Sequence, residues 1–263
     1  MMTERPAAVA GMFYPANAAQ LRQDIDYYLD QATTQQQPPK AIIVPHAGYI
    51  YSGPIAASAY TNLRSLQHQI KKVVLLGPAH RVPFQGLAAP SVDFFSTPLG
   101  KIKIDHAAIQ SVRHLPQIVI LDTAHELEHS LEVQLPFLQV VLDDFELIPL
   151  VVGEASKQDV ADVLNILWGG EETLIVISSD LSHYNSYQVA QQMDLETSHA
   201  IEKLQPEKIH YDMACGRNPV NGLLEVAKQK HLRVTTLDCR NSGDTAGDKN
   251  RVVGYGAYAF SEP

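Results

Sequence analysis

Hydrophobic and polar positions along the chain follow two alternating patterns. Short, continuous runs of apolar and β-branched residues predict strands at 41–45, 72–77, 146–153, 173–180, 233–239 and 252–260. Between most of these runs, apolar residues recur with helical spacing and predict helices at 21–32, 54–63, 131–142, 159–168, 186–204 and 221–230. We expect Asn17 to cap the first helix. We expect Pro54 to lie in the first turn of the second helix, where proline fits.

The order of these elements predicts an α/β fold. Strands that alternate with helices favour a central, largely parallel or mixed sheet with helices on both faces. The run LIVI, within 173–180, is apolar at every position, which is typical of a strand buried on both faces. The chain shows no internal repeat and no shift of composition. We therefore expect residues 1–263 to form a single domain.

Composition narrows the classes of function. The 263 residues are 45% hydrophobic and 19% charged, as is usual for a globular protein. A net charge of −9 and the absence of basic runs argue against a nucleic-acid partner. We expect neither a membrane span nor a secretory signal, because the long apolar segments that these require are missing. Two cysteines make no disulfide framework, which favours a reducing cytoplasm.

Residues that bind metals or transfer protons follow four of the predicted strands. In chain order they are His46, His80, Asp180, His183, Cys239 and Asp244. Ligands of open α/β sheets bind beyond the carboxyl ends of the strands, and parallel strands would bring these residues to one edge. Each residue alone also fits a structural role, as a turn histidine, a buried thiol or a helix cap. Their coincidence at four strand ends favours a shared metal or catalytic site.

The segment HELEH (125–129) matches the H-E-x-x-H signature of zinc proteases, in which two histidines one helical turn apart bind zinc. Here Ser130 is a candidate cap for a helix that begins at Leu131, which would leave the segment in a loop and break that spacing. We favour a different role, in which Glu128 and His129 reach the strand-end site as acid/base groups or as partners of its ligands.

Other residues near these motifs keep two interpretations open. Gly48 follows His46 closely and permits a tight turn or the close approach of a ligand. Tyr49 is expected either to line the resulting cleft or to pack in the core. Glu132 and Gln134 are expected on a solvated helix face.

Several motifs, in this order, resemble the Memo family, whose bacterial and archaeal members are often labelled AmmeMemoRadiSam system protein B. They are PHAGYIYSG, LGPAH, EHSLEVQLPFL, SSDLSHY, CGRNPV and DCRNSGD, and the resemblance runs nearly end to end. The family is similar in fold to the class III extradiol dioxygenases (LigB-like). In those non-haem iron enzymes, two histidines and a carboxylate bind iron and another histidine is the acid/base. The resemblance implies that His46 and His80 are metal ligands, His183 is the acid/base, and Cys239 replaces the carboxylate.

This replacement changes the expected chemistry. A thiolate favours copper(I), zinc or thiolate-bound iron, so the resemblance implies an iron or copper cofactor, with zinc as an alternative. The resemblance implies metal binding with a proposed redox role, and a dioxygenase-like architecture does not by itself imply dioxygenase activity. If the protein is a metal-dependent, dioxygenase-like enzyme, we expect Asp180 and His129 to be further catalytic groups. Glu128, Asp244 and Tyr49 would contact the ligands or the substrate. The alternative is a non-catalytic binding, scaffold or copper- and iron-handling protein with a vestigial site. In either case a small molecule or peptide would occupy the strand-end cleft.

Overall fold

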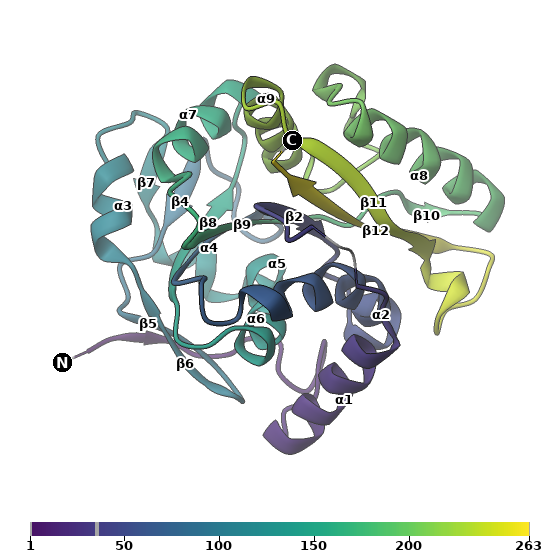
Figure 1. Ribbon diagram of the computed structural model, residues 1–263, viewed down its shortest axis with the longest axis horizontal. Coiled ribbons are helices and arrows are strands. Elements are labelled where there is room, and N and C mark those ends of the chain that lie inside the picture. Colours follow the sequence, from purple (N-terminus) through teal and green to yellow (C-terminus); the bar gives the residue numbers. More distant parts are fainter. Residues whose placement is uncertain (1, 35–36, 263) are drawn as a thin grey trace.

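The computed structural model describes residues 2–34 and 37–262, and its mixed sheet carries helices on both faces (Figure 1). Five adjacent parallel strands form the centre. In spatial order they are β6 (Gly100–Ile104), β8 (Glu146–Val152), β3 (Lys72–Pro78), β9 (Thr173–Ser178) and β2 (Ala41–Val44). Beyond β2 the sheet continues with antiparallel neighbours, first β12 (Val252–Ser261) and then β11 (Arg233–Asn241). The predicted α/β fold is confirmed.

The hydrophobic pattern did not predict β6, and it also missed several short strands that extend the sheet at its edges. They are β1 (Glu4–Arg5), β4 (Leu87–Ala89), β5 (Phe94–Thr97), β7 (Ile118–Ile120) and β10 (His183–Asn185). Most of these strands have only three or four residues, which is too few to show the alternation of apolar and polar residues that predicts a strand. They are recognised only by their hydrogen bonds to neighbouring strands. The helices α3 (His106–Val112) and α4 (Asp122–Glu126), which lie between β6 and β8 in the chain, were likewise not predicted.

Two groups of helices cover the two faces of the sheet (Figure 1). One face carries α1 (Ala18–Gln31), α2 (Tyr49–Tyr60), α5 (His129–Glu132) and α6 (Leu135–Val141). The other carries α3, α7 (Lys157–Leu167) and α9 (Arg217–Gln229), while α8 (Tyr187–Glu202) packs on β11 and β12. Short 3-10 helices occur at Thr61–Leu66, Pro206–Lys208 and Ser242–Asp244. None of the helices in the described ranges is long and apolar enough to cross a membrane.

Local signals account for several helix boundaries. Asn17 caps α1 as predicted, because its side chain accepts a hydrogen bond from the Gln20 amide. Pro54 does not lie in the first turn of α2, since this helix begins earlier, at Tyr49, within the glycine-rich stretch that resembled a turn. The predicted helix over 131–142 is divided into α5 and α6, and Pro136 lies in the first turn of α6.

Candidate metal centre

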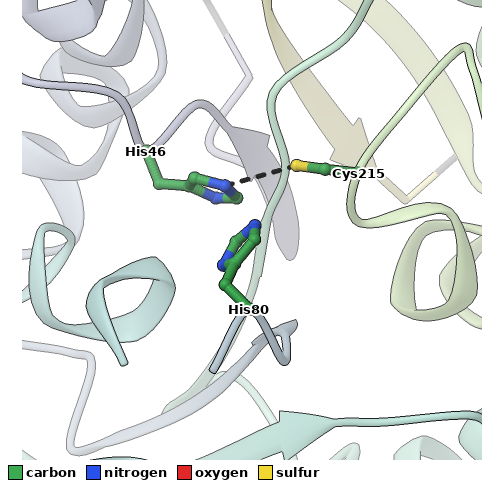
Figure 2. A group of neighbouring side chains, drawn as sticks. All are labelled: His46, His80 and Cys215. Atoms are coloured by element: carbon green, nitrogen blue, oxygen red, sulfur yellow. Dashed lines mark hydrogen bonds between the residues drawn. The ribbon is translucent and has the colours of Figure 1, made fainter. Parts of the chain in front are cut away.

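Three adjacent parallel strands bring the predicted histidines together. His46 and His80 lie just beyond β2 and β3, and His183 follows β9, which lies between them. The rings of His46 and His80 have centroids 5.1 Å apart and point toward the same space (Figure 2). The Cys215 Sγ atom lies 3.3 Å from His46 Nε2 on the opposite side of that space. One donor atom from each of these three residues lies within 4.8 Å of the others, so the group can hold a metal ion.

The thiol in this group is not the predicted one. Cys239 lies inside β11, which continues to Asn241, and its Sγ contacts the Ser198 hydroxyl of α8 at 3.5 Å. The expectation that Cys239 accompanies the two histidines is therefore corrected to Cys215, which lies two residues before the start of α9. The apolar pattern predicted that this strand ends at Cys239, but β11 continues for two more residues, so Cys239 lies within the strand and not beyond its end. The signal for Cys215 was the CGRNPV motif just before a predicted helix.

Hydrogen bonds determine which nitrogen of His46 carries the proton. The Ser178 hydroxyl donates its only hydrogen to the Ser130 carbonyl at 2.6 Å and accepts one from the Gln134 amide at 2.8 Å. Its remaining contact, with His46 Nδ1 at 2.8 Å, must therefore be donated by the imidazole. Burial, followed by the neighbouring His80 and other imidazoles, lowers the pKa of His46 well below its usual value. Neutral His46 thus presents a free electron pair at Nε2, beside the Cys215 thiol.

Glu128 orients His80 in the same way. Its Oε1 accepts a hydrogen bond from His80 Nδ1 at 2.8 Å, and its Oε2 accepts one from the His80 amide at 2.6 Å. Burial would raise the pKa of the Glu128 carboxyl, but the hydrogen bonds and charge of His80 outweigh it and lower this pKa to about 2. Because the carboxylate holds the proton of His80 on Nδ1, the Nε2 electron pair is free for a metal, as in carboxylate–histidine–zinc sites. Glu128 thus contacts His80 directly.

Two polar side chains that follow His129 in the chain are buried. Glu132 and Gln134, which the sequence placed on a solvated face, are 0% and 1% exposed. Gln134 donates hydrogen bonds to the Pro45 carbonyl and the Ser178 hydroxyl, which fixes the backbone next to His46. Glu132 accepts hydrogen bonds from the Arg5 guanidinium and the Tyr14 hydroxyl and so ties the N-terminal segment to α5. The solvated-face prediction is wrong because these groups find partners in the interior.

The zinc-protease interpretation of HELEH is also wrong. The helix α4 ends at Glu126 and Glu128 caps α5, so no continuous helix presents the two histidines on one face. His125 is buried away from the site, where its Nε2 donates to the Ala88 carbonyl at 2.9 Å. His129 lies at the site, with its ring stacked on His80 at 4.6 Å. Burial lowers the pKa of His129 to about 4, so this imidazole is neutral at pH 7.

An open cleft of about 880 Å³ leads to the group and is lined by two of its members, His80 and Cys215. His183 lines the same cleft, and its Nδ1 lies 2.8 Å from the Leu181 carbonyl, to which it donates. Its Nε2 is therefore the basic nitrogen. Burial raises the pKa of the Cys215 thiol, which a bound cation would oppose by favouring the thiolate.

The remaining predicted residues lie farther from the cleft surface. The Asp180 carboxylate is buried and accepts a hydrogen bond from the His46 amide at 2.7 Å, so it fixes the backbone of His46. Tyr49 is a core residue: its hydroxyl donates to the Val133 carbonyl and its ring packs on Phe137. Asp244 accepts hydrogen bonds from Tyr187 and from the Asn241 amide at the end of β11. Neither Tyr49 nor Asp244 lines the cleft.

Comparison with known proteins agrees with these motifs. The model of a family described as Memo-like protein matches residues 5–259. A MEMO1 family protein of Ignicoccus hospitalis is 36% identical, with both chains covered completely. One from Aquifex aeolicus is 37% identical over 97% of this chain and 98% of its own. One from Aeropyrum pernix is 37% identical over 97% and 99%, respectively.

Proposed function

We propose, from the premise that this chain belongs to the Memo family, that it is a metal-dependent redox enzyme acting on a small molecule in the cleft. One observation carries the proposal. Two imidazoles, each held by a hydrogen bond at Nδ1, and a thiol converge where an 880 Å³ cleft, of a size that suits a small molecule, reaches them. Peripheral hydrogen bonds fix both imidazoles, as expected of ligands prepared for a metal.

His46, His80 and Cys215 would hold the ion. Two imidazoles and a thiolate suit iron, copper or zinc better than magnesium or calcium, which prefer oxygen ligands. A bound iron or copper ion would supply electron transfer and would polarise an oxygen atom of the substrate. These three residues would leave a position on the ion for a substrate, as in catalytic rather than structural metal sites.

His183 would act as the general acid/base. The Leu181 carbonyl holds the proton of the imidazole on Nδ1, so Nε2 can accept a proton from a substrate hydroxyl in the cleft. His129, whose imidazole is neutral at pH 7, lies next to His80 and would contact the bound substrate or the second reactant. Asp180 would act indirectly, by holding the His46 backbone.

Metal handling without turnover is the second candidate. The Cys215 thiol favours it, because a soft thiolate with two imidazoles also suits copper(I). A copper(I) affinity too weak to compete with common cellular thiols would count against this function. Repeated turnover of any substrate would favour the enzyme.

The proposed enzyme is tested by anaerobic reconstitution with iron(II) or copper, followed by metal analysis and a screen of catechols under oxygen. We expect metal-dependent turnover that falls by about 10²–10⁴-fold in His183→Gln, with the metal content retained. His46→Ala and His80→Ala should lose the metal. Unchanged metal content in both of these variants would refute the proposed centre.

A further inference from the structure

One cation in the cleft has no strong partner. The Arg217 side chain lines the cleft and is 32% exposed. Its Nη2 lies 4.0 Å from a carboxylate oxygen of Glu154, at the outer limit of an ion pair, and Glu154 is itself 69% exposed. Within the described ranges, no group accepts a hydrogen bond from the guanidinium, which stacks above the exposed Tyr211 ring at 5.5 Å. Its donors are therefore available to a ligand.

Arg217 lies close to the candidate metal centre in the chain. It is the first residue of α9 and follows Cys215 by two positions, so the two Cα atoms are at most about 7.6 Å apart. The lining of the same cleft also includes the apolar side chains of Phe84, Met193 and Pro219. A molecule bound in the cleft can thus contact apolar surface as well as the thiol and the guanidinium.

We propose that Arg217 binds the oxyanion of a small substrate, a carboxylate or a phosphate ester, on an apolar body such as an aromatic ring. A planar guanidinium donates two parallel hydrogen bonds to either group. Only the placement of the reactive end of the substrate at His46, His80 and Cys215 rests on the proposed function. A structural role for Arg217 is small, because its two partners are exposed and such pairs contribute little to stability.

Arg251 provides a matched control. Its guanidinium also stacks on an exposed tyrosine, Tyr184, at 4.4 Å, but Arg251 is not among the residues that line the cleft. Arg251→Met therefore removes the same charge and the same type of stacking as Arg217→Met. Tyr184 itself lines the cleft, so Arg251→Met removes a charge close to the proposed anion site and leaves Arg217 and Tyr211 unchanged.

The test is calorimetric titration of the metal-free, full-length protein with benzoate, phenyl phosphate and neutral benzamide. We expect at least one anion to bind about 10- to 100-fold more tightly than benzamide, as hydrogen bonds to a charged group provide. Arg217→Met and Arg217→Gln should lose this preference, and Arg251→Met should keep it. Tighter binding of benzoate would assign a carboxylate substrate, and tighter binding of phenyl phosphate a phosphate ester.

Equal binding of anions and benzamide, binding of neither anion, or a preference retained in both Arg217 variants would overturn the assignment. So would an equal loss in Arg251→Met, because the effect would then be one of net charge. The titrations contain no metal, so their failure leaves the proposed metal chemistry standing. Failure of metal reconstitution, in turn, leaves the anion preference of Arg217 standing.

Discussion

Replacement of Glu128 by glutamine tests how the protein prepares His80. The carboxylate accepts three hydrogen bonds, two from His80 and one from the Ser130 amide at 2.9 Å. An amide offers one oxygen and one NH₂ group, so in either orientation the NH₂ group meets a donor. If the NH₂ group faces His80 Nδ1, this nitrogen must become the acceptor and its proton must move to Nε2, the nitrogen that faces the site (Figure 2).

The structure gives the size of this effect. Hydrogen bonds to a charged group contribute about 1.5–3 kcal/mol each, and the variant loses at least one of them. We expect the free energy of unfolding to fall by about 2–4 kcal/mol, since a donor-to-donor contact is added. Metal affinity should fall by about 10- to 100-fold, as for other carboxylates that orient a histidine ligand.

Competition of the metal-free protein with a chromophoric chelator for zinc(II) measures this affinity. Glu126→Gln is the matched control, because it makes the same change of charge two residues away on an exposed side chain. Should Glu128→Gln bind zinc within a factor of about two of the control, the carboxylate does not prepare His80 and the reasoning is refuted.

Three further changes probe the buried polar groups. Ser178→Ala removes the hydrogen bonds that Ser178 makes with His46 Nδ1–H and the Ser130 carbonyl, and one of the two that the Gln134 amide donates. Denaturant unfolding should therefore show a loss of about 2–5 kcal/mol. Burial raises the pKa of Asp194 from 3.8 to about 6, so its contribution to stability is complete below pH 3.8 and is lost as the pH rises through 6. The free energy of unfolding of the wild-type protein should therefore fall by at most about 3 kcal/mol over this pH range, and that of Asp194→Asn should not show this fall. Identical dependence on pH for the wild type and Asp194→Asn would contradict this. Glu132→Gln leaves the Arg5 charge buried and should lower the free energy of unfolding by about 3–5 kcal/mol, measured in the same way.

The sequence predicted the part of the site that depends on parallel strands. The apolar runs that became β2, β3 and β9 are buried and regular, so their ends were evident from local composition. Parallel order then brings His46, His80 and His183 to one edge without further information.

The third member of the group depends on packing that local patterns do not encode. Cys215 reaches the histidines because α9 packs against α7 and β9, which positions the preceding loop. Cys239 had the stronger local signal, at the apparent end of a strand that continues to Asn241. Polar residues such as Glu132 gave no sign of burial either, because the partner that neutralises Glu132, Arg5, lies far away in the sequence.

The metal content of two cysteine variants tests the central claim most directly. Wild-type protein, Cys215→Ser and Cys239→Ser are reconstituted anaerobically with the same ion, freed of excess metal and analysed for ions per chain. We predict that the wild type and Cys239→Ser retain the metal and that Cys215→Ser loses it. Loss from Cys239→Ser with full retention by Cys215→Ser would contradict the centre described here.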